Sequence, residues 1–432
     1  MGNAAETGRY GAQPLLYQLH ELNRTLLKPA TYLAKATADV FSAPGSLFAQ
    51  LPGAARLAAG YELFYRLGKS YERPQFDIKS VEAHGANVAV IEKTILSKPF
   101  CRLLRFKRYS DEPEVIRELK RDPIVLVVPP LSGHHPTLVR DTVRTLLGSH
   151  KVYVTEWLDA RTVPLSEGDF SLDDYVDYIR EFVRHIGASR LHVISICQPT
   201  VPVLAAVSLM AAAGETEPLS LTMMGGPIDT RRNPTRVNDL ASVEPLSWFE
   251  RNMLHEVPGN YPGHGRQVCP GFLQHAGFIA MNPVRHITSH WDFYLDLVKG
   301  DLNDADEHRR FYDEYNAVLD MPGQYYMDCI RIVFQQHLLP RGLWYVRGQR
   351  VAPESIKGAA LLTIEGELDD ISGLGQTRAA QDLCAHIPAD HKRHLTVEGA
   401  GHYGIFSGRR WREKVYPQVR EFIAAADAAP PR

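Results

Sequence analysis

A cysteine stands where an apolar run turns directly into a helical pattern. The run LHVISI has the composition of a strand buried on both faces of a parallel sheet, and small apolar residues at helical spacing follow from Pro199. Cys197 therefore has the position of a nucleophile elbow, in which a sharp strand-to-helix turn holds a reactive side chain above the sheet. The electropositive N-terminus of the following helix favours the thiolate. Simple packing is the alternative interpretation, because free cysteine is among the most buried residue types.

An acid and a histidine follow two further strand-like runs. The run ALLTI precedes EGELDD, which places Asp369 three residues after Gly366, and the run HLTV precedes EGAGH, which places His402 in a glycine-flanked loop. Nucleophile, acid and histidine thus occur in the chain order of α/β-hydrolases. We expect His402 to take the thiol proton and later to activate water, while Asp369 orients the imidazole.

Alternatives to two of these assignments stay open. Asp370 and Glu367 lie in the same turn as Asp369, which we favour because it has the usual Gly-x-x-Asp spacing. Ser195 is the rival nucleophile. Because it precedes Cys197 by two residues, it would still lie within the strand, where a small side chain lets the turn pack closely.

An oxyanion hole needs two N–H groups aimed at the carbonyl oxygen of the substrate. We expect one from the backbone of Gln198, directly after the nucleophile, and the other from the turn after the apolar strand IVLVVPP. Leu131 and Ser132 are the candidates in that turn, and we favour Leu131. A plain strand-terminating loop fits the same residues, because backbone donors have no side-chain signature.

Strands and helices must alternate to bring these residues together. Apolar strand-like runs and helical segments do alternate along most of the chain, which predicts an α/β-hydrolase fold with a mostly parallel sheet and helices on both faces. The segment LDDYVDYIREFVRHI predicts one of the helices, with Ser171 as its N-cap and Gly187 just past its end. Another helix is expected over residues 375–387.

The same pattern divides the chain into four segments. We predict a helical N-terminal extension over residues 1–80, a first part of the hydrolase core over 81–228, a cap or lid insertion over 229–345, and a second part of the core over 346–425. The insertion holds 16 of the 40 aromatic residues. A long aromatic insertion between two sheet strands predicts a cover over the carboxyl ends of the strands, where ligands bind in such sheets.

Composition and charge exclude several classes of protein. Hydrophobic residues make up 44% and charged residues 23%, and the formal net charge is −2, so no nucleic-acid partner is indicated. The longest apolar stretch, within residues 201–213, is too short to span a bilayer, so we expect no integral membrane insertion. MGNAAETGRY lacks a basic segment followed by an apolar core, so no signal peptide is expected. Five scattered cysteines then fit reduced thiols in a cytoplasm.

No metal or organic cofactor is expected. The histidines and the cysteine of the insertion match no zinc spacing, nor does the histidine pair after the IVLVVPP strand. These residues are His264, Cys269 and His275, and His134 and His135. A second role for His134 or His135 beside the oxyanion turn stays open.

At these residues the sequence resembles the intracellular polyhydroxybutyrate depolymerases, which are α/β-hydrolases with Cys where most relatives have Ser. The resemblance rests on VISICQPTVPVLAA, VYVTEWLDARTVPLSEGDFSLDDYVDYI, LLTIEGELDDISGLGQT and EGAGHYGIFSGRRW, and it extends over about residues 88–422. The general Gly-x-nucleophile-x-Gly pattern is replaced by SICQP, in agreement with the Cys-Gln-Pro form of this family. Carried over to these positions, the family's triad falls on Cys197, Asp369 and His402.

The resemblance implies hydrolysis of ester bonds in amorphous poly(3-hydroxybutyrate) through an acyl-cysteine intermediate, with release of 3-hydroxybutyrate or oligomers. It also implies a cytoplasmic protein that associates with the surface of polyhydroxyalkanoate granules. A polyhydroxyalkanoate synthase-like acyltransferase is an alternative, although its usual Gly-x-Cys-x-Gly-Gly elbow is absent, and a non-catalytic granule-coating protein is another. The sequence leaves open the chain-length preference, cleavage from ends or internally, water or coenzyme A as acyl acceptor, the oligomeric state and the mode of granule docking.

Overall fold

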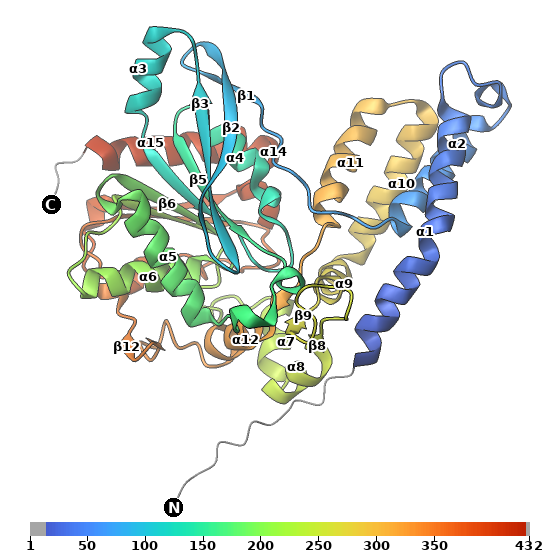
Figure 1. The fold of residues 1–432 in the computed structure, drawn as a ribbon. Coiled ribbons are helices and arrows are strands. Elements are labelled where there is room, and N and C mark those ends of the chain that lie inside the picture. Colours follow the sequence, from blue (N-terminus) through green and yellow to red (C-terminus); the bar gives the residue numbers. More distant parts are fainter. Residues whose placement is uncertain (1–13, 429–432) are drawn as a thin grey trace, which may run out of the picture.

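A nine-stranded sheet forms the centre of the protein in the computed structural model, which describes residues 14–428 (Figure 1). The strand order is β1-β2-β3-β5-β4-β6-β7-β13-β14, with antiparallel pairing from β1 to β5 and parallel pairing from β5 to β14. The strands are β1 (Ser80–Ala83), β2 (Ala86–Ser97), β3 (Cys101–Tyr109), β4 (Ile124–Val128), β5 (Lys151–Trp157), β6 (Leu191–Ile196), β7 (Ser220–Met224), β13 (Ala360–Gly366) and β14 (Lys392–Val397).

Helices cover both faces of the parallel strands, which explains why these strands are apolar. β4 has the sequence IVLVV and β6 the sequence LHVISI, and every residue of β6 is buried. Side chains from α5 (Leu172–Ile186) and α6 (Thr200–Ala212) pack on one face, and side chains from α4 (Arg140–Leu146) and α15 (Tyr416–Ala428) pack on the other (Figure 1). This arrangement is the α/β-hydrolase fold, so the predicted fold class is confirmed.

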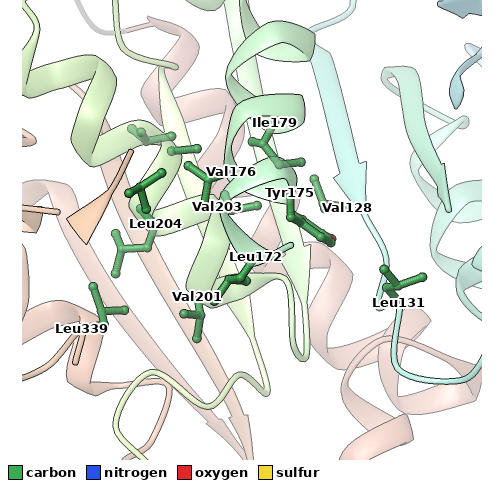
Figure 2. Close-up of a cluster of buried hydrophobic side chains, with 14 of the residues drawn as sticks. Val128, Leu131, Leu172, Tyr175, Val176, Ile179, Val201, Val203, Leu204 and Leu339 are labelled. Atoms are coloured by element: carbon green, nitrogen blue, oxygen red, sulfur yellow. The ribbon is translucent and has the colours of Figure 1, made fainter. Parts of the chain in front are cut away.

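The core beside α5 and α6 fixes the strand ends that lead to the candidate site. Figure 2 shows side chains of both helices packed in front of β4, with Leu131 in the turn after that strand. Ser171 caps α5: its hydroxyl accepts the N–H of Asp174, and the Asp174 carboxylate accepts the Ser171 N–H at 2.8 Å. Gly187, with φ of +102°, follows the last helical residue. Both ends of α5 therefore lie where the sequence predicts them.

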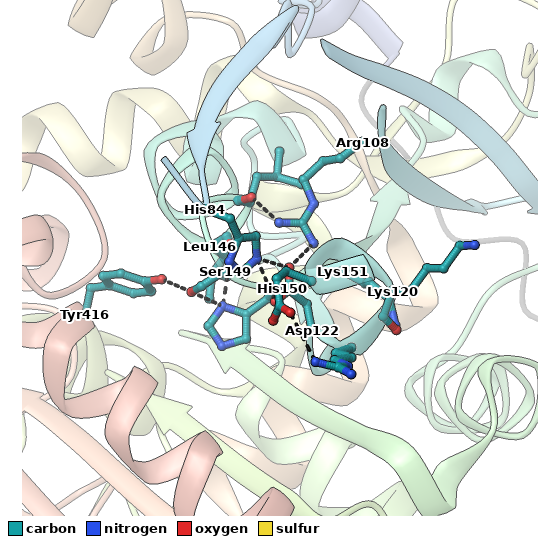
Figure 3. Close-up of polar contacts among 12 residues, drawn as sticks. His84, Arg108, Lys120, Asp122, Leu146, Ser149, His150, Lys151 and Tyr416 are labelled. Atoms are coloured by element: carbon teal, nitrogen blue, oxygen red, sulfur yellow. Dashed lines mark hydrogen bonds and ion pairs between the residues drawn. The ribbon is translucent and has the colours of Figure 1, made fainter. Parts of the chain in front are cut away.

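A buried ion pair joins the antiparallel part of the sheet to the segment before β4 (Figure 3). Arg108 near the end of β3 donates hydrogen bonds to the Asp122 carboxylate at 2.6 Å and to the Leu147 carbonyl at 2.7 Å. His84 Nε2 contacts the same carboxylate at 3.0 Å. The Arg108 and Asp122 side chains are only 3% and 8% exposed, so loss of either would leave an uncompensated buried charge. This pair stabilises the register of the strand that ends at the candidate oxyanion turn.

The segment between β7 and β13 contains six α-helices and a small three-stranded sheet within the described residues. In this small antiparallel sheet, β9 lies between β8 and β10. The residues just before β10 contact the turn after β4, where the Leu319 N–H donates to the Gly133 carbonyl at 2.9 Å. The elements are α7 (Arg236–Val243), α8 (Leu246–Met253), β8 (His255–Glu256), β9 (Gln267–Cys269), α9 (Gly271–Met281), α10 (Pro283–Lys299), α11 (Leu302–Tyr315), β10 (Met321–Pro322) and α12 (Gly323–Asp328).

Two N-terminal helices pack beside this insertion rather than on the sheet (Figure 1). α1 (Pro14–Ser42) packs against α2 (Ala54–Gly68), and α2 packs against α10. Arg66 of α2 donates to the Arg309 carbonyl at 2.9 Å and to Asp313 at 3.0 Å, which fixes α2 to α11. None of the helices between residues 14 and 428 combines the length and the apolar character needed to cross a membrane. The segment examined for a signal peptide lies outside the described residues.

The helix expected over residues 375–387 is shorter in the structure, where only α13 (Ala379–Leu383) is helical. The buried Glu365 carboxylate accepts the backbone N–H groups of Gly375 and Arg378, both at 2.9 Å, and Gly375 adopts a positive φ of +93°. Thr377 Oγ1 accepts the Gly226 N–H at 2.7 Å. These contacts hold the residues before α13 in turns that support the end of β7. The conformation of this segment therefore depends on contacts with other strands and not on its own composition.

Candidate active site

Cys197 occupies a strained turn between β6 and α6. Its φ is +66°, which is rare for a residue with a side chain and is typical of functional turns. The surrounding backbone holds this conformation: the Cys197 N–H donates to the Met224 carbonyl at 2.7 Å, and its carbonyl accepts from the N–H and hydroxyl of Thr200. A Cβ on Gly226 would lie 1.8 Å from Thr200 Oγ1, so the neighbouring strand end approaches closely only because it has glycine there. The turn has the geometry of a nucleophile elbow.

His402 and Asp369 form a buried pair beside this turn. His402 Nδ1 lies 2.8 Å from Asp369 Oδ2, and the Asp369 side chain is fully buried. The other carboxylate oxygen accepts the N–H groups of Ile371 at 2.9 Å and Ser372 at 2.8 Å. Because an ionised carboxylate only accepts hydrogen bonds, Nδ1 must be the nitrogen that donates. The remaining nitrogen, Nε2, is thereby left for the thiol.

The side chains of Cys197 and His402 line the same cavity, and the two groups interact electrostatically. Burial disfavours the charged imidazolium, but the carboxylate of Asp369 and the thiolate of Cys197 both stabilise it and outweigh burial. The pKa of His402 therefore lies well above its ordinary value of 6.5. A positively charged imidazole beside Cys197 is the arrangement that activates a cysteine nucleophile.

The rival residues from the sequence have partners other than His402. Glu367 accepts the Gly399 N–H at 2.7 Å, and Asp370 is hydrogen-bonded by the side chain of Asn282. Ser195 is 1% exposed within β6, and its hydroxyl donates to the Thr222 carbonyl of the next strand. Geometry thus favours Asp369 over the other two carboxylates and Cys197 over Ser195.

A cavity of about 450 Å³ opens onto Cys197 and His402. Gln198 and Ser132 are among the polar residues that line it together with Cys197. The rest of its wall is mainly apolar and comes from the insertion: Leu240, Phe249, Met253, Phe278, Met281 and Phe334 are among the lining side chains. The cavity therefore suits an uncharged acyl chain. These lining residues are missed by sequence reasoning, because helical spacing does not distinguish a cavity wall from a core face.

Of the two predicted oxyanion donors, Gln198 lines this cavity and Leu131 lies between the lining residues Pro130 and Ser132. Among the described residues, no backbone or side-chain acceptor is paired with the N–H of Gln198 or with that of Leu131. The Leu131 side chain is buried in the core, whereas neighbouring Ser132 lines the cavity. Two free donors after β4 and β6 are what an oxyanion hole requires. The choice of Leu131 stays a prediction.

His134 has a role in positioning this turn. Its ring contacts the backbone carbonyls of Ser132 and of Tyr315 in α11, the latter at 3.2 Å from Nε2. Burial, together with the charge of nearby His275, lowers the pKa of His134 to about 4, so the ring is neutral at pH 7. His134 thus connects the oxyanion turn to the insertion. The sequence left a second role for it open without indicating this one.

The histidines and the cysteine considered for a metal site have other surroundings. His264 contacts the Val257 carbonyl at 3.2 Å, His275 contacts Asn316 at 2.9 Å, and Cys269 is buried in the core. Between residues 14 and 428, no group of three or more His, Cys, Asp or Glu side chains is arranged to hold a metal ion.

Residues 225–427 match a family model described as "PHB de-polymerase C-terminus". No curated protein matches the chain. Similar solved structures include a putative lipase from Acinetobacter baumannii AYE, with 12% identity, a TM-score of 0.41 and coverage of 78% of this chain and 93% of that chain. A monoacylglycerol lipase from Paleococcus ferrophilus has 14% identity, a TM-score of 0.42 and coverage of 71% and 96%. Since these TM-scores are low, the fold assignment rests on the strand order of this chain.

We expect Asp369→Asn to slow alkylation of Cys197 by iodoacetamide at pH 7 at least about tenfold. A change of one unit in the pKa of His402 changes the ratio of its charged to its neutral form tenfold. A group with a raised pKa keeps its proton to higher pH. Removal of the Asp369 charge lowers the pKa of His402, and with it the imidazolium fraction that stabilises the thiolate. Glu367→Gln should stay within about twofold of the wild type. Peptide mass spectrometry gives the rate at Cys197, and equal rates in all three proteins would contradict the ion pair.

Proposed function

We propose that this chain hydrolyses ester bonds of amorphous intracellular poly(3-hydroxybutyrate), with Cys197, His402 and Asp369 as its catalytic residues. Its match over residues 225–427 makes it a member of the polyhydroxybutyrate depolymerase family. Ester hydrolysis is the activity of this family. The observation that supports the proposal most is the buried hydrogen bond between Asp369 and His402, with His402 and Cys197 lining one mainly apolar cavity.

Acylation begins with attack of the Cys197 thiolate on the carbonyl carbon of the ester. A C–S bond forms, and the carbonyl oxygen takes the negative charge, which the N–H groups of Gln198 and Leu131 stabilise. When the tetrahedral intermediate collapses, the C–O bond of the ester breaks. His402 donates its Nε2 proton to the departing oxygen, so the leaving segment is released as an alcohol. The product on the enzyme is a 3-hydroxyacyl thioester of Cys197.

Deacylation repeats these steps with water. The now neutral His402 removes a proton from water, and the oxygen attacks the thioester carbon. The C–S bond breaks, the acyl group leaves as a carboxylic acid, and the thiolate of Cys197 is restored beside the imidazolium. Asp369 stabilises the charged imidazole at each step and holds it in one orientation.

The polymer suits the surroundings of the thiol. Each unit of poly(3-hydroxybutyrate) presents a methyl group and an ester but no charge, and the cavity wall is mainly apolar. Water is excluded from such a wall when a chain enters, which strengthens the electrostatic stabilisation of the oxyanion.

Granule association is proposed to use an apolar face that continues outward from the cavity. Val284 of α10 is 74% exposed and lines a neighbouring hollow that shares Met281 with the cavity wall. Ile287 of the same helix and Leu67 of α2 are 70% and 63% exposed and line one further hollow together with Leu27 of α1. Exposed apolar surface of this extent marks an interaction site. A polyester surface is the occupant we infer, because the polymer must enter through the same mouth.

Wild-type protein should release 3-hydroxybutyrate or its oligomers from amorphous granules, and Cys197→Ala should reduce the rate at least about a hundredfold, as removal of a nucleophile commonly does. Ser195→Ala is the matched control and should keep most of the activity. Release would be measured by chromatography of the soluble products. Activity that survives in Cys197→Ala and disappears in Ser195→Ala would refute the assignment of the nucleophile. No release from any variant would instead favour acyl transfer or a granule-coating role.

Replacing two residues of the apolar face, Leu67→Glu with Ile287→Glu, should lower the fraction of protein bound to granules at least about fivefold, because two charges would have to leave water at the polymer surface. Co-sedimentation would be measured in a Cys197→Ala background, so that the polymer is not consumed. Ile91→Glu makes the same change on β2, where the side chain is 47% exposed, and should bind like the parent. If Leu67→Glu with Ile287→Glu binds granules as well as Ile91→Glu does, the apolar face is not the docking surface.

A further inference from the structure

Two cavities meet at His402. The second has a volume of about 210 Å³, less than half that of the first. It shares Phe278, Met281, Ile371, His402 and Tyr403 with the first cavity, but neither Cys197 nor Gln198 lines it. Both cavities therefore contact His402, but only the first contacts the thiol.

Two arginines give the second cavity a positive charge. Arg285 of α10 and Arg410 of α14 (Gly408–Arg410) line it, together with Asp370. Within residues 14–428, neither guanidinium has a carboxylate at ion-pair distance, although the neighbours of Arg410 are paired: Arg409 with Glu413 at 2.9 Å and Arg412 with Asp141 at 2.7 Å.

The remaining titratable groups do not cancel this charge. Burial, and then the charge of Arg285, lower the pKa of His286, which is therefore neutral at pH 7. Asp370 offers one negative charge against two positive ones, and its carboxylate is already hydrogen-bonded by Asn282. The second cavity is thus a net positive site beside His402, with arginines free to bind an anion.

The chemistry of the proposed reaction indicates which part of the substrate would occupy the second cavity. His402 protonates the departing oxygen, so the leaving segment must be next to the imidazole. In this polyester the acyl segment contains the hydroxyl end of the chain, and the leaving alcohol contains the carboxyl end. When the last ester bond is cleaved, the leaving group is 3-hydroxybutyrate itself, which has a free carboxylate. Arginine is the side chain best suited to such a group, because its planar fork donates two parallel hydrogen bonds.

We propose that Arg285 and Arg410 bind the terminal carboxylate of the leaving unit, so that the enzyme removes 3-hydroxybutyrate one unit at a time from the carboxyl end. This inference rests on the proposed function. The larger apolar cavity then holds the acyl chain, and the smaller cavity holds one unit. Cleavage breaks the last C–O bond, forms the C–S bond at Cys197 and transfers the His402 proton to the hydroxyl of the released monomer.

A linear tetramer of 3-hydroxybutyrate tests this site in two forms, one with a free carboxylate and one with a methyl ester at that end. Wild-type protein should show a kcat/KM at least about tenfold higher for the free acid. A label in the carboxyl-terminal unit should appear first in the monomer. In Arg285→Gln/Arg410→Gln the ratio between the two substrates should fall toward one. Arg409→Gln, whose guanidinium pairs with Glu413, is the matched control and should keep the ratio of the wild type.

The outcomes separate this inference from the function on which it rests. A structural defect in the double variant would lower both rates together and leave the ratio unchanged, which would overturn the carboxylate site. Equal rates for the acid and the methyl ester in the wild type, or first release of labelled dimers, would overturn it as well. Hydrolysis of neither tetramer by the wild type would refute the proposed function, and the carboxylate site with it.

Discussion

The buried hydrogen bond between Asp369 and His402 is the contact on which the rest of the site depends. A histidine removed from water would lose its charge, yet the carboxylate keeps the pKa of His402 high and directs its free nitrogen toward Cys197. The parallel sheet makes this possible, since the carboxyl ends of β6, β13 and β14 lie at one edge. Backbone N–H groups after β13 hold the carboxylate, and the close strand end at Gly226 accommodates the strained turn at Cys197. The chemistry therefore depends on the packing of strand ends that are far apart in sequence.

The insertion determines what can reach this triad. Helices α7 to α9 supply much of the apolar wall of the cavity at the thiol, while α10 supplies Arg285 to the second cavity at His402. The buried, neutral ring of His134 in the turn after β4 contacts the Tyr315 carbonyl of α11, which links this turn to the segment between β7 and β13. Exposed apolar side chains of α10 and the N-terminal helices, among them Ile287 and Leu67, line a separate hollow on the outer surface. The segment between β7 and β13 thus contributes to both cavities that meet at His402.

Local patterns predict the fold and the candidate residues well, and non-local contacts account for the differences. The apolar runs of β4 and β6 require cover on both faces, and the chain order of Cys197, Asp369 and His402 predicts that they meet at one edge. Spacing favours Asp369 over Asp370 and Glu367, but only the structure shows which carboxylate contacts the ring. The helix expected over residues 375–387 is shortened by hydrogen bonds to Glu365, a residue ten positions away whose side chain is buried. The unpaired arginines beside His402 come from α10 and α14, and no sequence motif connects them.

Trapping of the acyl-enzyme tests the central claim most directly. The protein would be mixed with an oligomer of 3-hydroxybutyrate, quenched in acid within milliseconds, digested and analysed by mass spectrometry. The account predicts a 3-hydroxyacyl thioester on the peptide that contains Cys197, which hydroxylamine removes and which does not form in Cys197→Ala. An acyl group on Ser195, or hydrolysis of the oligomer with no adduct on Cys197 at any quench time, would contradict it.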